Sequence, residues 1–400
     1  MGIRSIYLFL TYFPLFVIII WDALKVYLNL GSPIIQFAVL APVLLVGVSE
    51  NLNKGFLDIL FSRPVSTWLV WIIYSLLNTL VVIDKTYQDN NPIILAFSLF
   101  VVLIFILFIV NLNIKTASLL KILIFSYFFR LLLSYIFDSE GAYQRFGSEF
   151  NSNSIAFGAL FLVGLIFLKK IQFNEIRKID YFILFIAIYT IFITGSRKNF
   201  ISLVLLLIGY IYIYRSFSKV KNIFKYSFFL IIIGFSMIWI LNNTLTGERL
   251  IDSYYKTISH SQSGDKEMMF DSRARYYVHG WQLFKEHPIN GIGLRNFQNY
   301  DYVNNSLHTE YMSQITEGGL IGTFLFLYFY AYILLRLFKI RKKQNDLKRL
   351  TEFYILLLII MFVLFFGTWI YRTPMMWVFI ALAIRFIKEA KQNKIQLVSS

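Results

Sequence analysis

Arginine residues recur in the segments that separate the apolar runs of this chain. A guanidinium group stays charged at any working pH, and its planar fork binds two phosphate oxygens at once. Several arginines that converge at a membrane surface would therefore suit a diphosphate carried on a lipid, although exposed loop arginines without a role are also common. The candidate diphosphate-binding residues are Arg145, Arg197, Arg273 and Arg275, with Arg372 as a weaker candidate.

Arg197 is the sharpest of these candidates. It lies in "TGSRKNF", a tight break between two apolar runs that Gly195 and Ser196 open. Ionisable residues near membrane depth are functional candidates by default, because a charge in lipid is costly. The alternatives are snorkelling and a structural ion pair. Arg130 lies inside an apolar run, where it would pair with a carboxylate or face a cavity, and we assign it no role.

His308 supplies a second kind of chemistry. A neutral imidazole accepts a proton near neutral pH. Glycosyl transfer from a sugar diphosphate needs an acceptor hydroxyl that loses its proton and a leaving group whose charge is stabilised. A histidine base and several arginines supply both without a metal or a cofactor. His260, His279 and His287 lie in the same region, and spacing alone does not choose among the four.

Two carboxylates follow His308. If the segment 308–317 is helical, Glu310 and Glu317 share one face of it. Glu317 would lie at the membrane boundary, where it could orient an arginine or bind a sugar hydroxyl, so it is a candidate catalytic residue. The face of His308 would carry Tyr311, Met312 and Ile315.

Glycines cluster in two places near these residues. We interpret Gly318, Gly319 and Gly322 as sites of close helix packing. The "GIG" at 291–293 is not a nucleotide-binding loop, because no strand precedes it and no G-x-G-x-x-G is complete.

The composition predicts an all-α polytopic membrane protein that positions these residues. Of the 400 residues, 58% are hydrophobic and only 15% are charged, whereas soluble domains average about 25% charged residues. No cysteine is present, which excludes disulfides, thiolate metal sites and a cysteine nucleophile. The net charge of +16 lies mostly in short loops on one side of the membrane, so we expect no nucleic-acid partner.

Apolar runs of about 20 residues recur along the chain, each long enough to cross a bilayer as a helix. We expect the first run to be a retained helix, because no cleavage site follows it. With the N-terminus inside, the predicted cytoplasmic side holds 24 Lys and Arg residues, four of them just within the cytoplasmic ends of the spans, and the outer side holds 6 once its long loop is set aside. This asymmetry places both termini in the cytoplasm. The twelve predicted spans are 5–20, 33–48, 65–83, 92–112, 117–137, 154–168, 179–194, 199–214, 224–241, 318–338, 352–369 and 373–387.

One long extracytoplasmic loop, 242–317, separates the spans 1–241 from the last part of the chain, 318–400. Connections of this length are usually functional. Within it, "DSRARYYVHGWQLFKEH" has apolar residues at helical spacing and predicts an amphipathic helix on the membrane surface. The apolar residues of this helix are Tyr277, Trp281, Leu283 and Phe284.

Four motifs, in order over about residues 145–325, resemble the bacterial O-antigen ligase and O-antigen polymerase superfamily. "RFGSEFNSNSIAF" is similar to its earlier outer loop, and "TGSRKNFISLVLLL" to its Ser-Arg turn before a helix. "SRARYYVHGWQLFKEHPINGIGLRNF" resembles its large periplasmic loop. "HTEYMSQITEGGLIGTF" resembles its histidine segment, with Thr309 where an asparagine is usual.

The resemblance implies a GT-C-like glycosyltransferase that needs no metal and uses a glycan on undecaprenyl diphosphate as donor. His308 takes the position of the catalytic histidine, and Arg197 and Arg273 take those of the diphosphate-binding arginines. Arg145 and Glu317 follow by weaker matches.

We therefore predict a polysaccharide polymerase of the Wzy type in the bacterial cytoplasmic membrane, with its active site facing the periplasm or exterior. The alternatives are an O-antigen ligase with lipid A core as acceptor, a transporter or flippase, and a structural scaffold. The expected partners are the lipid-linked glycan and membrane lipids. The sugars, their linkage and the binding of a chain-length regulator stay open.

Overall fold

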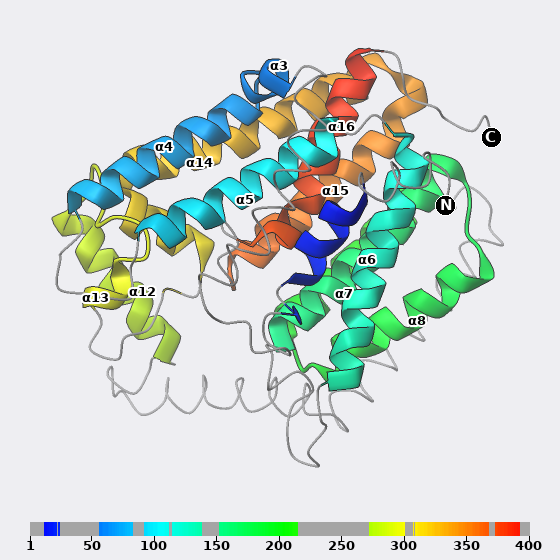
Figure 1. Cartoon of the computed structure of the whole chain (residues 1–400), viewed down its shortest axis with the longest axis horizontal. Helices are drawn as coiled ribbons and strands as arrows, with labels where there is room; N and C mark the ends of the chain where they lie inside the picture. Colours follow the sequence, from blue (N-terminus) through cyan, green and yellow to red (C-terminus); the bar gives the residue numbers. More distant parts are fainter. Residues whose placement is uncertain are drawn as a thin grey trace.

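The structure is a computed structural model, and it describes residues 12–21, 23–24, 56–82, 92–111, 114–137, 152–214, 272–300, 307, 309–367 and 373–392. Every regular element within these residues is a helix (Figure 1). The helices are α3 (Phe56–Leu60), α4 (Val65–Val82), α5 (Pro92–Asn111), α6 (Thr116–Phe137), α7 (Ser152–Phe173), α8 (Lys178–Ile193), α9 (Arg197–Tyr214), α12 (Ser272–Glu286), α13 (Phe297–Tyr300), α14 (Glu310–Lys343), η2 (Asn345–Leu347), α15 (Lys348–Phe365), η3 (Pro374–Trp377) and α16 (Val378–Lys391).

Five of the described helices are long and apolar enough to cross a membrane, namely α4, α6, α7, α9 and α14. Two shorter apolar helices, Tyr12–Trp21 and Leu95–Asn111, add to them. The prediction of an all-α membrane protein is therefore confirmed. The predicted spans 33–48 and 224–241 lie outside the described residues. The count of twelve, the orientation and the division of the chain into three parts thus stay predictions.

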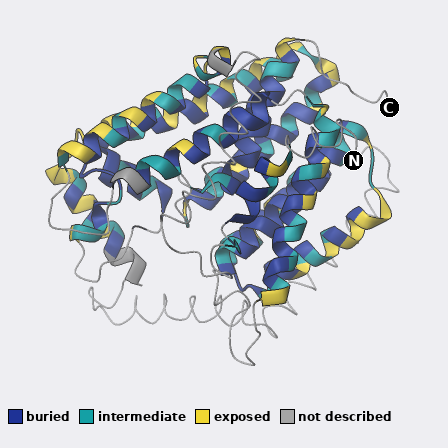
Figure 2. Cartoon of the chain, viewed as in Figure 1, coloured by how far each residue is buried: buried dark blue, intermediate teal, exposed yellow. Residues whose placement is uncertain are grey.

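The helix α7 lies at the centre of the bundle, because it is apolar on all sides rather than along one stripe. In its apolar window 83% of the residues are buried, against 33% for α4 and for α14 (Figure 2). It packs against α6, α8, α9 and α15. The helices α4 and α14 instead expose large apolar side chains, such as Leu77, Val81 and Phe324, that lipid can cover.

Tryptophan side chains fix α4 in the core. Trp68 stacks on Trp71 with ring centroids 4.3 Å apart, and Trp377 of η3 lies 4.1 Å from Trp68. None of the three side chains is exposed. Buried aromatic pairs of this kind contribute beyond the area that they bury. The helix α4 is therefore a rigid support for anything that its other residues hold.

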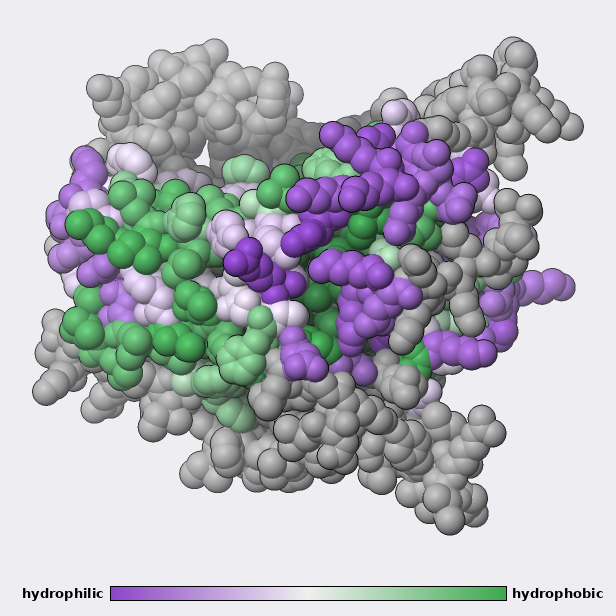
Figure 3. All heavy atoms as spheres, turned by 90° about the horizontal axis from the view of Figure 1, so that it is seen from above, coloured by the Kyte–Doolittle hydropathy of each residue, from purple (hydrophilic) through white to green (hydrophobic). Residues whose placement is uncertain are grey.

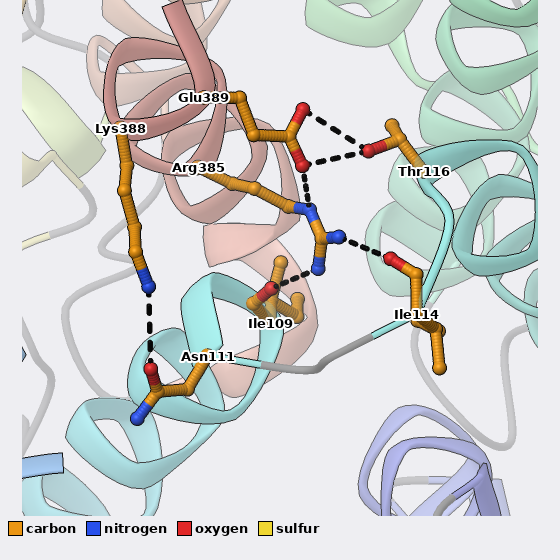
Figure 4. A network of polar contacts seen from close by, with 7 residues as sticks. All are labelled: Ile109, Asn111, Ile114, Thr116, Arg385, Lys388 and Glu389. Carbon is orange, nitrogen blue, oxygen red and sulfur yellow. Dashed lines mark hydrogen bonds and ion pairs between the residues drawn. The ribbon is translucent and has the colours of Figure 1, made fainter. Parts of the chain in front are cut away.

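Arg385 joins α16 to the connection between α5 and α6 (Figure 4). Its guanidinium group donates to the backbone carbonyls of Ile109 at 2.9 Å and Ile114 at 2.5 Å, and it pairs with Glu389 at 2.7 Å. The Glu389 carboxylate also accepts a hydrogen bond from the Thr116 hydroxyl at 2.9 Å. The carbonyl groups in the last turn of a helix have no intrahelical partner, so a buried cation stabilises the end of α5.

Hydrophilic and hydrophobic side chains separate on the face seen from above (Figure 3). Hydrophobic side chains cover the part of this face over α4 and α14, and hydrophilic side chains gather toward the end where α14 and α16 finish. The last turns of both helices are basic. They contain Arg341, Lys342 and Lys343 in α14, and Lys388 and Lys391 in α16. The hydrophilic end of this face is therefore basic.

The substitution Arg385→Met should destabilise the protein by about 1–3 kcal/mol, because it leaves the backbone carbonyls of Ile109 and Ile114 without the donor that satisfies them. Thermal unfolding of the purified protein in detergent would measure the effect. The control Lys391→Gln changes an exposed cation in the same helix, and it should shift stability by less than about 0.5 kcal/mol. Equal unfolding midpoints for the two variants would contradict a stabilising role for the Arg385 contacts.

Candidate active site

The helix α14 is broken at Gly319. It begins at Glu310, eight residues before the predicted span, and Gly319 interrupts it with φ 61° and ψ −164°. In an unbroken helix the N–H groups of Leu320 and Ile321 would donate to the carbonyls of Thr316 and Glu317. The break removes these bonds and leaves four backbone groups in need of partners.

The loop after α12 supplies all four partners. Its residues 288–293 lie against the break, where two of its carbonyls accept the freed N–H groups and two of its own N–H groups donate to the freed carbonyls. An irregular backbone at membrane depth is stable only when its polar groups are satisfied in this way. The bonds are Leu320 N–H to Pro288 O at 2.9 Å, Ile321 N–H to Ile289 O at 3.2 Å, Ile292 N–H to Thr316 O at 3.1 Å and Gly293 N–H to Glu317 O at 2.9 Å.

Glycines permit this close approach. Gly291 has φ +70° and Gly319 has φ +61°, and a Cβ atom on either would meet the backbone of the other. At Gly322 a Cβ atom would lie 3.1 Å from the Tyr74 ring of α4. The predicted close helix packing is thus confirmed at Gly322, and it is wrong for Gly319, whose close neighbour is the backbone of the loop. It is also wrong for Gly318, where a Cβ atom would find its nearest neighbour at 3.7 Å.

Glu317 lies at the break and is only 3% exposed. The backbone N–H groups of Arg295 and Phe297 bind its carboxylate, and the positive charge of Arg295 acts on it. Its Oε2 atom has no hydrogen-bond partner among the described residues. The carboxylate therefore organises the turn at 293–297, where Arg295 itself has φ 61°. Sequence reasoning expected an arginine partner for Glu317 but did not identify Arg295.

Glu310 begins α14 and is fully buried. Gln314 donates a hydrogen bond to its carboxylate at 2.8 Å, and the Trp71 indole N–H donates to Gln314 at 3.1 Å. The prediction that Glu310 and Glu317 share a face is confirmed, because both are buried on the inner side of one helix. His308, two residues earlier, lies outside the described residues.

Arg197 is the first residue of α9. Side-chain hydrogen bonds from α7 and α9 anchor the turn that precedes it. The Ser196 hydroxyl donates to Asn153 Oδ1 at 2.9 Å, and Asn199 donates back to Ser196 at 2.8 Å. These contacts bind the turn to the first residues of α7. The Arg197 side chain is partly exposed and has no ion-pair partner in the described part of the chain. A helix N-terminus also favours negative charge, so this position suits an anion.

The end of α15 supports both α9 and α14. The Lys198 ammonium, next to Arg197, donates to the Gly367 carbonyl at this end. The Tyr311 hydroxyl of α14 donates to the Phe362 carbonyl at 2.9 Å. The first turns of α9 and α14 therefore lie at the same end of the bundle.

The helix predicted after residue 271 is confirmed as α12, but its apolar residues do not share one face. Leu283 is 4% exposed and packs in a small cluster with Tyr276 and Phe297, whereas Trp281 is 49% exposed. The Thr316 hydroxyl of α14 donates to the Gly280 carbonyl at 3.0 Å, which fixes α12 on α14. Packing against protein therefore uses one side of α12 and leaves another side exposed.

The remaining arginines are placed unevenly. Arg273 and Arg275 lie in the first turn of α12, although their side chains are outside the description, and Arg145 and Arg372 lie outside the described residues. Arg130 is 1% exposed and donates to the carbonyl and hydroxyl oxygens of Ser154 at 3.2 and 2.9 Å. A buried arginine thus holds the start of α7, next to the residue that anchors the Arg197 turn.

The described helices form a membrane protein in which the candidate residues Arg197 and Glu310 lie at the first turns of α9 and α14. Residues 182–327 match the family described as O-antigen ligase (Wzy_C). This segment includes α9, α12 and the first part of α14, and the match agrees with the resemblance of the four motifs to the superfamily of O-antigen ligases and polymerases. No curated protein matches the chain. The family and the apolar helices together indicate a membrane enzyme that processes glycans.

The substitution Gly319→Ala should destabilise the protein by about 1–3 kcal/mol, because only glycine adopts this backbone conformation without strain. The added Cβ would also push the loop away from the break. The matched control is Gly318→Ala, which has ordinary room and should change stability by less than about 0.5 kcal/mol. Thermal unfolding in detergent measures both, and equal midpoints would contradict the assigned role of Gly319.

Proposed function

We propose that the protein is a glycosyltransferase that polymerises undecaprenyl-diphosphate-linked oligosaccharide units into a surface polysaccharide. The observation that carries this proposal is the placement of Arg197 within the matched segment. Its side chain has no ion-pair partner in the described part of the chain and lies at the start of α9, on a turn fixed by Ser196, Asn153 and Asn199. A guanidinium beside a helix N-terminus is suited to a diphosphate on a lipid carrier.

The reaction moves one proton and one glycosyl group. His308 takes the proton of the acceptor hydroxyl, whose oxygen attacks the anomeric carbon of the donor. The bond between that carbon and the diphosphate oxygen breaks, and undecaprenyl diphosphate leaves with the electron pair. Arg197 and Arg273, supported by Arg145 and Arg275, offset the negative charge that develops on this leaving group. These side chains therefore supply the general base and the stabilisation of the leaving group without a cofactor or a metal.

Glu317 has a supporting role in this proposal. Its carboxylate binds the backbone at Arg295 and Phe297 and so shapes the loop next to the break in α14. The second oxygen, Oε2, has no partner in the described part of the chain and is available to a sugar hydroxyl or an arginine.

The second candidate is an O-antigen ligase, which the description of the matched family favours. It would use the same donor and the same residues, with lipid A core as acceptor. A transporter is a remote third candidate, because broken helices line the substrate sites of many transporters. The broken ends of α14 are instead bonded to the loop 288–293 of the same chain, and the sequence has no internal repeat.

The proposal is tested with purified protein in lipid vesicles and a lipid-linked repeat unit as substrate. A ladder of longer lipid-linked glycans supports the polymerase. Transfer to lipid A core without such a ladder supports the ligase and contradicts polymerase activity. Vesicle transport of the substrate without any transfer would contradict both.

The substitution His308→Ala should lower the turnover of the transfer by about two to four orders of magnitude, the usual loss when a general base is removed. The measurement is product formation at saturating donor and acceptor. The matched control is His287→Ala, since His287 is an exposed histidine directly after α12, and it should keep its turnover. Comparable losses in the two variants would contradict a specific role for His308.

The substitution Arg197→Lys should also impair transfer, because a single ammonium does not reproduce bidentate binding of phosphate oxygens. We expect at least a tenfold loss in kcat/KM for the lipid donor, with unfolding midpoints unchanged. The control Arg177→Lys alters an exposed arginine between α7 and α8 that pairs with Glu175. It should leave kcat/KM unchanged. An active Arg197→Lys variant would contradict the phosphate-binding role.

A further inference from the structure

Three side chains of α4 hold the loop that fills the break in α14. Asn78 donates a hydrogen bond to the Asn290 carbonyl at 2.6 Å. The Tyr74 hydroxyl lies 3.0 Å from the Gly318 carbonyl and 3.4 Å from that of Asn290. These positions on α4 are one turn apart, so they face the loop together.

Thr79 adds a third contact of a different kind. Its hydroxyl donates to the Ser75 carbonyl of its own helix at 2.7 Å and accepts a hydrogen bond from the Leu294 N–H at 3.0 Å. The donated bond fixes the hydroxyl so that its lone pairs face the loop. Thr79 is 1% exposed and Leu294 is 2% exposed, so water cannot easily replace this acceptor.

The loop that these three side chains hold connects two parts of the candidate site. It connects α12, whose first turn carries Arg273 and Arg275, to the segment that leads to His308 and α14. The same loop fills the break in α14 through four backbone hydrogen bonds. A shift of the loop would therefore strain the connection between α12 and the start of α14.

The helix α4 is well suited to hold the loop still. Its middle is fixed in the core by Trp68 and Trp71, which are not exposed. It lies outside the matched segment 182–327, and none of its residues carries chemistry of its own in the proposed reaction. Its polar side chains are therefore supports and not members of the reacting set.

We propose that Tyr74, Asn78 and Thr79 form a latch of positioning residues that fixes the loop 288–294 and, through it, the arginines of α12 relative to the histidine segment. This inference rests on the proposed function. The latch does not touch the substrate. It keeps the diphosphate-binding groups and the base at the separation that the transfer requires, and small displacements of such groups reduce rates strongly.

The test compares Thr79→Val with Thr79→Ser. Valine keeps the shape of the side chain but removes the acceptor for the Leu294 N–H, whereas serine keeps the oxygen. We expect Thr79→Val to lower kcat for glycan transfer by about 10- to 100-fold while KM for the lipid donor changes less. Thr79→Ser should restore kcat to within about threefold. The control Ser75→Ala removes a buried hydroxyl of the same helix that has no partner in the described part of the chain. It should leave kcat unchanged.

Hydrogen exchange provides a readout that does not depend on activity. Local opening sets the exchange rate of a protected amide, so the peptide covering 288–297 should exchange at least about tenfold faster in Thr79→Val and in Tyr74→Phe. Thr79→Ser should exchange like the unsubstituted protein. Tyr74→Phe keeps the ring that packs on Gly322 and so guards against a variant that merely fails to fold.

The outcomes separate the two proposals. Faster exchange together with a lower kcat, both reversed by serine, supports the latch. Faster exchange with unchanged kcat overturns it, and so does a lower kcat with unchanged exchange. An unsubstituted protein that transfers no glycan contradicts the proposed function, and the exchange experiment then still decides whether α4 holds the loop.

Discussion

At Gly319, bonds to the loop 288–293 replace hydrogen bonds of the helix, and this end of the protein depends on that replacement. A helix that breaks in an apolar environment exposes backbone groups whose desolvation costs several kcal/mol if they stay unpaired. The loop 288–293 satisfies the freed groups on both sides of the break. The loop cannot leave without uncovering them all, and α14 cannot straighten without expelling the loop. The two segments therefore form one rigid unit.

This unit is joined to the bundle through buried polar contacts. Trp71 of α4 reaches Gln314 and, through it, the buried carboxylate of Glu310. Tyr311 binds the end of α15. Hydrogen bonds in a low-dielectric interior are strong when every member is satisfied and costly when one is lost. Such contacts fix the first turn of α14 more firmly than apolar packing alone, which tolerates sliding.

The sequence predicted the helices well and the connections between them less well. The run 117–137 became α6 at Thr116–Phe137, because a long apolar stretch has few alternatives in lipid. The break at Gly319 was not predicted, since glycine spacing looks the same for helix packing and for a positive φ. The partners of Tyr74 lie more than 200 residues away in sequence, so nothing local indicates them. Likewise, Leu283 is buried and Trp281 is exposed because α14 packs on one side of α12. The spacing of these residues in the sequence does not show which side that is.

The candidate site is therefore a property of the whole bundle and not of the matched segment. Arg197 lies within that segment, but Asn153 of α7 anchors its turn and Gly367, just after α15, receives its neighbour Lys198. The loop beside Glu317 is held by α4. All of these supports come from outside residues 182–327. A charged group on a surface turn has many conformations, and binding a diphosphate would cost the entropy of ordering it. Anchoring the backbone of each such turn on a buried helix removes part of that cost before the substrate arrives, which is why polar side chains persist in otherwise apolar helices such as α4 and α7.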